Sequence, residues 1–187
     1  MTSVEPLRER LVTAGVAMLE DTGASQLGLR AIAREAGVSH GAPRRYFPTH
    51  TALLAAIAAA GYHDLRAEIE AVQADSPRHR VDRTGLAYVE FAVRRPEMFA
   101  LMFRHDLLEG AGENLRETVS LPLFRHWREL VSSCVPDPTG ERAMCLWTNL
   151  HGLAVLAANR SLEAVAPEAD LRALVLGSIA RYLGTPS

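Results

Sequence analysis

The sequence has no lysine, only two cysteines and few aromatic residues. All 20 basic residues are arginines, and the missing lysine carries no functional inference. Cys134 and Cys145 are too few for a disulfide framework, and their spacing matches no metal site, so we expect a reducing, cytoplasmic environment. The longest apolar run, Ala52 to Gly61, is much shorter than the roughly 18 residues of a membrane helix. The N-terminal segment lacks the positive-then-apolar layout of a secretion signal.

A strong charge of one sign is also missing from the 187 residues. The formal net charge of −2 excludes a uniformly basic nucleic-acid coat, although it permits a local basic patch. Apolar residues make up 48% of the chain, which is enough for a packed core. They recur at spacings of three and four nearly throughout, with no alternating strand pattern and no internal repeat. The sequence therefore predicts an all-α fold of about nine helices, three shorter ones first and longer ones after.

Glycine and proline residues set the expected helix boundaries. The pattern predicts helices over about Val4–Thr22, Gly28–Ala36, His50–Ala74 and His79–Arg95, a short helix from Pro96, helices marked by Leu115–Cys134 and Ala143–Ala157, and a last helix over about Pro167–Leu183. A further short helix, capped by Ser39, is expected before Pro48. Pro43 would be its fourth helical residue and would lose only the first backbone hydrogen bond, so we expect this helix to survive.

The most informative segment runs from Leu29 to Leu54 and reads LRAIAREAGVSHGAPRRYFPTHTALL. Two short helices joined by a tight turn at Gly37 form a helix-turn-helix arrangement. Glycine suits the turn because it adopts a positive φ without steric cost. The segment contains four arginines, here called the arginine patch, against the single acidic residue Glu35. The patch comprises Arg30, Arg34, Arg44 and Arg45. In this arrangement the second helix would enter the major groove of DNA.

The pattern LxxIAxxAGVSxGxxxxYF resembles the DNA-binding domain of TetR-family transcriptional regulators from about Arg10 to Leu65. The stretch LWTNLHGLAVL is similar to a Trp-x(3)-His-Gly-Leu stretch in some of their C-terminal domains. The resemblance implies a DNA-binding domain over residues 1–65 and a ligand-binding and dimerisation domain over residues 66–187. It further implies a ligand-responsive repressor that binds a palindromic operator as a homodimer through its last two long helices. Three positions depart from the family: Arg44 replaces a common tyrosine, His50 replaces a common lysine, and Gly28 replaces the usual serine or threonine cap of the second helix.

The site residues follow from this resemblance and from the local charges. The expected DNA contacts are Arg30, Ser39, His40, Gly41, Ala42, Arg44, Arg45, Tyr46, Thr49 and His50. The residues expected to line a cavity for a small, mostly apolar effector are Phe91, Met98, Phe99, Met102, Phe103, Leu123, Trp127, Trp147 and His151. Core packing is the competing and commoner interpretation for each residue of this second set. Arg44 or Arg45 is expected to contact a base edge.

Two other functional classes compete with a regulator. One is an all-helical enzyme or carrier, and the other is a helical interaction protein that does not bind DNA. The sequence has no nucleophile elbow, phosphate loop or suitably spaced carboxylate pair, and its histidines show no metal-ligand spacing. We therefore expect no catalytic residues, no metal and no cofactor. Both alternatives leave the arginine patch and the helix-turn-helix spacing unexplained.

Overall fold

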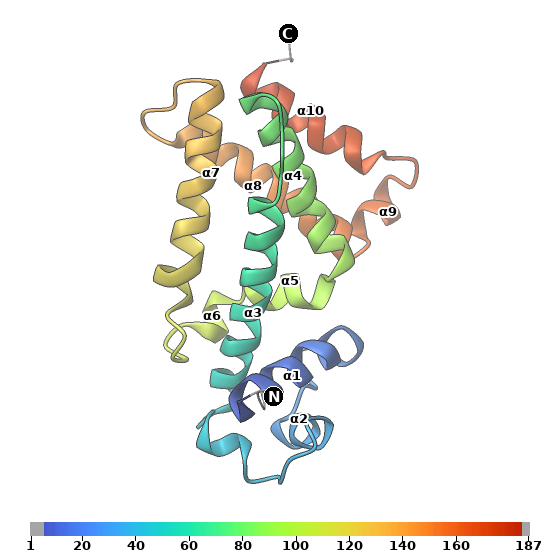
Figure 1. Ribbon diagram of the computed structural model, residues 1–187. Coiled ribbons are helices and arrows are strands. Elements are labelled where there is room, and N and C mark those ends of the chain that lie inside the picture. The colour runs from blue at the N-terminus through green and yellow to red at the C-terminus, as the bar shows by residue number, and fades with distance from the viewer. Residues whose placement is uncertain (1–5, 185–187) are drawn as a thin grey trace. The chain divides into compact units, whose positions relative to one another are not determined.

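The computed structural model describes residues 6–184, and this part of the chain forms ten α-helices and no strand (Figure 1). The helices are α1 (Leu7–Thr22), α2 (Leu29–Glu35), α3 (His50–Glu70), α4 (Pro77–Arg94), α5 (Pro96–Met102), α6 (His105–Leu108), α7 (Leu121–Cys134), α8 (Glu141–Ala158), α9 (Ser161–Val165) and α10 (Leu171–Leu183). A 3₁₀ turn, η1 (Pro43–Arg45), precedes α3, and a π-helical turn, η2 (Arg116–Ser120), precedes α7. The predicted all-α fold is confirmed.

Several predicted boundaries were wrong. The short helix capped by Ser39 is replaced by η1, and α3 ends at Glu70 rather than at Ala74. The prediction missed α6 and α9, and the last predicted helix corresponds to α10 alone. The helix α10 begins at Leu171 rather than at Pro167, because the Asp170 side chain accepts a hydrogen bond from the Ala173 N–H there. Val4, the predicted start of the first helix, lies outside the described residues.

The described chain divides into two compact units, each built from two stretches of sequence. Unit 1 holds residues 6–63 and 97–119, and unit 2 holds residues 64–96 and 120–184. The helix α3 therefore contributes residues to both units. The functional boundary at residue 65 stays a prediction. The sequence-based prediction placed residues 97–119 in the second domain. In the structure they group with the N-terminal residues in unit 1.

The core of unit 1 consists of buried apolar side chains from α1, α2, α3 and α5. Phe47 and Leu54 are buried, whereas Met18 is half-buried. Small residues allow the helices to approach closely. A Cβ on Gly61 would lie 2.4 Å from the Met98 Sδ atom, so only glycine fits there without a shift of the methionine. The buried core of this unit fixes where α2 and the start of α3 are held.

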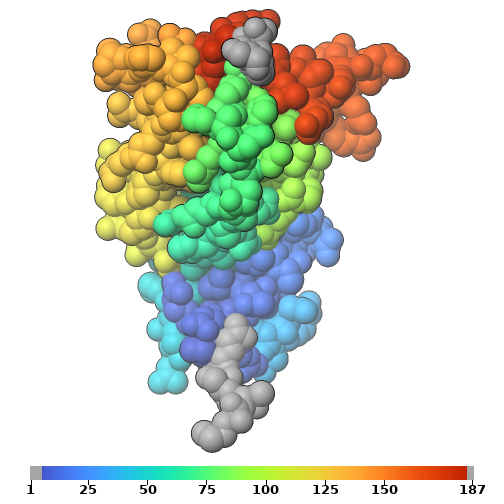
Figure 2. All heavy atoms as spheres, turned by 45° about the horizontal axis from the view of Figure 1, so that its top comes forward, coloured from blue at the N-terminus to red at the C-terminus, as the bar shows by residue number. Residues whose placement is uncertain are grey.

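Unit 2 is a helical bundle in which α4 packs against α7, α8 and α10 (Figure 1). A Cβ on Gly85 of α4 would lie 2.9 Å from the Ile179 Cδ1 atom of α10, so a small residue brings these two helices together. The Trp127 indole N–H of α7 donates to the Ala143 carbonyl oxygen of α8 over 2.9 Å. The side chains of α9 and α10 form a continuous part of the surface of this unit (Figure 2). No helix between residues 6 and 184 is long and apolar enough to cross a membrane.

Candidate nucleic-acid interface

The turn after α2 has the geometry that its glycine predicts. Gly37 has a φ of +66°, and the backbone N–H groups of Ala36, Gly37 and Val38 donate to carbonyl oxygens of α2 over 2.8–3.1 Å. These bonds satisfy the carbonyl groups that a helix leaves free at its C-terminal end. The chain therefore leaves α2 in a fixed direction, and the predicted turn of the helix-turn-helix is confirmed.

The segment after this turn is shorter and tighter than a recognition helix. Pro43 has no N–H and cannot donate a hydrogen bond to the Ser39 carbonyl oxygen. The Ala42 N–H donates to that oxygen instead, over 3.0 Å. This i to i+3 bond starts a 3₁₀ turn in place of an α-helix. Successive side chains of such a turn diverge by about 120°, rather than the 100° of an α-helix, so Arg44 and Arg45 face clearly different directions.

The described structure leaves all four arginines of the patch exposed. Ser39, His40 and Gly41 are also exposed, Ala42 is half-buried, and 46% of the Tyr46 surface is accessible. Within residues 6–184, no arginine of the patch has a side-chain hydrogen bond or an ion pair, whereas arginines such as Arg66 and Arg94 are paired with glutamates. Residues around 35–50, drawn in light blue and cyan, lie at the surface of unit 1 (Figure 2). Unpaired guanidinium groups on an exposed turn are suited to phosphate and guanine recognition.

Thr49 and His50 occupy the start of α3 and have different contacts. The Thr49 Oγ1 atom accepts a hydrogen bond from the Ala52 N–H over 3.0 Å, so Thr49 caps α3. The His50 Nε2 atom lies 2.6 Å from the Leu27 carbonyl oxygen, so Nε2 carries the proton and donates to that oxygen. This ring nitrogen is therefore not available to a phosphate, and it ties α3 to the segment that precedes α2.

Two arginines of α1 contact the helix-turn-helix segment, and the sequence analysis predicted neither contact. The Arg10 Nη2 atom donates to the Ala36 carbonyl oxygen over 2.6 Å, which anchors the end of α2. The Arg8 guanidinium carbon lies 5.4 Å from the centre of the Phe47 ring, a cation–π distance, and Arg8 also forms an ion pair with Glu113. No local pattern indicates these contacts, because the partners are at least 26 residues apart in the sequence.

The nine residues predicted to line an effector cavity lie in both units. Met98, Phe99, Met102 and Phe103 belong to unit 1, and Phe91, Leu123, Trp127, Trp147 and His151 belong to unit 2. The first three of unit 1 are buried, and Phe99 and Phe103 pack with their ring centres 4.9 Å apart. In unit 2 the His151 ring stacks on Trp147 at 5.4 Å.

His151 is held from a second side by Tyr88 of α4. The His151 Nδ1 atom lies 2.8 Å from the Tyr88 hydroxyl oxygen, so one of these two groups donates to the other. Burial lowers the pKa of His151, because desolvation penalises its charged form. Trp147 also contacts Phe124 edge to face at 5.8 Å. This aromatic cluster in unit 2 thus offers an apolar surface with a few polar groups, and Phe91 and Trp127 of the same unit are buried.

Helix-turn-helix proteins that bind DNA are the class that the fold and this exposed segment define. Two family models specify it further. The model described as "Bacterial regulatory proteins, tetR family" matches residues 11–57. The model described as "Tetracyclin repressor-like, C-terminal domain" matches residues 81–177, more than half of the chain. The chain therefore belongs to the TetR family of transcriptional regulators, with a DNA-binding N-terminal domain and a ligand-binding C-terminal domain. Such regulators are generally not enzymes.

Solved structures give the same fold. A protein of unknown function from Rhodococcus sp. RHA1 is 28% identical, with a TM-score of 0.82 over 97% of this chain and 96% of that one. The TetR regulator SCO7222 from Streptomyces coelicolor is 20% identical, with a TM-score of 0.72 over 94% and 95%. BioQ, solved with its natural double-stranded DNA operator, is 20% identical, with a TM-score of 0.61 over 92% and 98%. A comparison with curated protein sequences gave no significant match.

Proposed function

We propose that this regulator is a repressor that binds a palindromic DNA operator as a homodimer and is released by a small, mostly apolar effector. The observation that carries the DNA-binding part is the exposed arginine patch without competing ion pairs. A whole molecule of net charge −2 has no general attraction to DNA, so a concentrated patch on a helix-turn-helix must supply it. Membership of the family and the DNA-bound state of BioQ support the same function.

Four side chains of the interface have a proposed role. Arg45 contacts a base edge, and Tyr46 contacts the backbone or a thymine methyl group. Arg30 and the hydroxyl of Thr49 contact phosphates. The His50 ring is hydrogen-bonded to the Leu27 carbonyl oxygen. We therefore assign the phosphate contact predicted for His50 to the backbone N–H groups in the first turn of α3, because the N-terminus of a helix attracts anions. The remaining predicted contacts, at Ser39 to Ala42, lie on the exposed approach to η1.

Homodimerisation through α8 and α10 is supported by an apolar face that these helices leave exposed. Val155, Leu156 and Leu174 are 38–42% exposed, and a Cβ on Gly152 or Gly177 would meet no atom within 4 Å. Pairing this face with that of a second copy would bury it in a four-helix bundle, and the glycines would permit close approach.

The dimer is tested by sedimentation of a charged variant. Leu156→Asp is expected to sediment as a monomer, whereas the matched control Val165→Asp, on the 79% exposed Val165 of α9, should remain a dimer. A parent protein that sediments as a monomer at micromolar concentration would refute the proposed assembly. The operator is sought by footprinting DNA upstream of the chain's own gene, and the absence of any protected, near-palindromic site would refute the repressor assignment.

The effector site is assigned to unit 2, around Trp147 and His151. The lowered pKa of His151 keeps its imidazole neutral near pH 7, which suits a ligand with few charges. Binding there releases DNA only if the effector prefers a dimer geometry that cannot engage both half-sites. An effector identified by its release of operator should lose affinity in Trp147→Ala, and unchanged affinity would place the site elsewhere.

A further inference from the structure

The turn η1 and the residues around it, 38–46, form the segment that would contact DNA, here called the DNA-reading segment. Its entrance is fixed by the hydrogen bond from Arg10 to the end of α2. Its exit is closed by the Tyr46 and Phe47 N–H groups, which both donate to the Pro43 carbonyl oxygen, over 3.0 and 2.8 Å. The Phe47 side chain is buried. The position of the Phe47 ring therefore determines how the end of η1, with its two arginines, is held.

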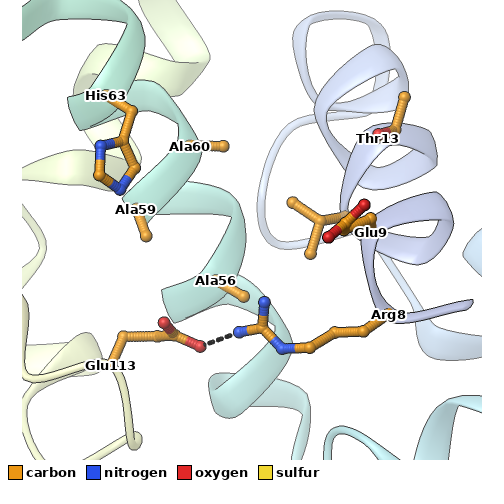
Figure 3. Close-up of a pocket in the computed structure, with 9 residues that line it drawn as sticks. Arg8, Glu9, Thr13, Ala56, Ala59, Ala60, His63 and Glu113 are labelled. Atoms are coloured by element: carbon orange, nitrogen blue, oxygen red, sulfur yellow. Dashed lines mark hydrogen bonds and ion pairs between the residues drawn. The ribbon is translucent and has the colours of Figure 1, made fainter. Parts of the chain in front are cut away.

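Arg8 of α1 contacts the Phe47 ring. Its guanidinium carbon lies 5.4 Å from the ring centre, a cation–π distance. An arginine side chain has many rotamers, and that of Arg8 is 43% exposed, so a second contact is needed to keep it in one conformation. That contact is an ion pair. Arg8 extends from α1 past Ala56 of α3, and its guanidinium group meets the Glu113 carboxylate (Figure 3). Glu113 thus selects the rotamer of Arg8 that contacts the ring.

Glu113 is itself held in place, although it lies on the loop between α6 and η2. The carbonyl oxygen of the next residue, Asn114, accepts hydrogen bonds from the N–H groups of Glu117 and Thr118, both over 3.0 Å. Leu115, one residue further on, is buried in unit 1. These contacts fix the backbone beside Glu113, so its carboxylate is a well-placed partner for Arg8.

We infer that Glu113 is a positioning residue for DNA binding. It orients Arg8, Arg8 holds the Phe47 ring, and the ring holds the DNA-reading segment in the conformation that contacts DNA. This inference rests on the proposed DNA-binding function. Its effect has the opposite sign to that of simple electrostatics. A carboxylate in the DNA-binding unit repels the phosphates, so a Glu113 that contributed only its charge would weaken DNA binding. A Glu113 that positions Arg8 strengthens it.

Replacement of Glu113 by glutamine separates these two effects. Fluorescence anisotropy of the full chain with an operator duplex recovered by footprinting should show about threefold weaker binding for each subunit of Glu113→Gln, the size expected for the loss of a partly exposed ion pair. The matched control Glu109→Gln removes the same charge from an exposed glutamate of the same loop, and it should bind as tightly as the parent or more tightly. The inference is overturned if Glu113→Gln binds at least as tightly as the parent, or if both variants lose affinity equally.

Hydrogen exchange of the free protein, followed by NMR, tests the same contacts without DNA. In Glu113→Gln the Tyr46 and Phe47 N–H groups should exchange about threefold faster, because the turn that they close opens more often. The N–H groups of α2 should exchange as in the parent. Unchanged exchange at Tyr46 and Phe47 overturns the inference. A parent that binds no DNA refutes the proposed function, whereas the exchange result still decides whether Glu113 holds this turn.

A double-mutant cycle tests the route through the ring. Phe47→Leu keeps a buried apolar side chain but removes the ring that Arg8 contacts. In this background Glu113→Gln should cause no further loss of DNA affinity, because the contact that it supports is already gone. An equal threefold loss in both backgrounds shows that Glu113 acts independently of Phe47 and overturns the inferred route. If Phe47→Leu does not fold, the anisotropy and exchange measurements on Glu113→Gln decide the question.

Discussion

The two glycines that flank α2 should respond to substitution with opposite signs. Gly37 closes the turn with a φ of +66°, and an added Cβ would meet only the Arg10 Nη2 atom, at 3.9 Å. The cost of Gly37→Ala is therefore backbone strain rather than a steric clash. A left-handed residue with a Cβ costs about 1–2 kcal/mol. Reduced freedom of the unfolded chain offsets about 0.4–1 kcal/mol of this. Taking the middle of each range, we expect Gly37→Ala to destabilise the protein by about 0.8 kcal/mol.

Gly28, at the other end of α2, is the matched comparison. It has a φ of −88° and a ψ of 147°, which any residue adopts, and an added Cβ would meet nothing within 4 Å. No side chain caps α2, so Gly28→Ser should stabilise the helix by a few tenths of a kcal/mol. Urea denaturation followed by far-UV circular dichroism measures both changes. Gly37→Asn should cost less than Gly37→Ala, since asparagine tolerates the left-handed region. The reasoning is refuted if Gly37→Ala is as stable as the parent or if asparagine costs as much as alanine.

Three further variants test individual contacts by the same denaturation assay. Thr49→Ala removes the cap that accepts the Ala52 N–H and should cost about 1 kcal/mol, and an unchanged midpoint would contradict that role. Trp127→Ala removes a buried ring and its bond to Ala143 and should cost about 3–5 kcal/mol, whereas a loss below about 1 kcal/mol would show that the ring is not part of the core. Burial lowers the pKa of His151 below 6.5, so its contribution to stability is complete above that pH and is lost as the pH falls further. The parent should therefore lose more stability than His151→Gln between about pH 7.5 and about pH 5, and equal losses would contradict this assignment.

Local signals in the sequence account for most of the helix-turn-helix. The turn at Gly37 and the cap at Thr49 depend on residues within a few positions, so the sequence was sufficient to predict them. The same reasoning was wrong at η1, because it treated Pro43 as the loss of a single hydrogen bond. The Ser39 carbonyl oxygen instead bonds the Ala42 N–H, and the tighter turn that results replaces the recognition helix.

Contacts between distant segments could not be read from the sequence. The Arg10 bond to Ala36, the ring contact of Arg8 with Phe47 and the His50 bond to Leu27 join residues 23 or more positions apart. The grouping of residues 97–119 with the N-terminal helices has the same origin, since it depends on packing between separate helices. Periodicity identifies which face of a helix is apolar, but it does not identify the helix that covers that face.

Binding of arginine variants to operator and to random DNA tests the central claim most directly. Fluorescence anisotropy at several salt concentrations gives the affinity and its salt dependence for each duplex. Arg45→Ala should cost roughly 1–3 kcal/mol on the operator and much less on random DNA. Arg30→Ala should weaken binding to both duplexes equally. It should also reduce the slope of the logarithm of affinity against the logarithm of salt concentration by about one per subunit. Arg172→Ala, on an exposed arginine of α10, is the control and should change neither. If Arg44→Ala and Arg45→Ala both bound operator and random DNA as the parent does, the assignment of this segment as the DNA-reading element would be wrong.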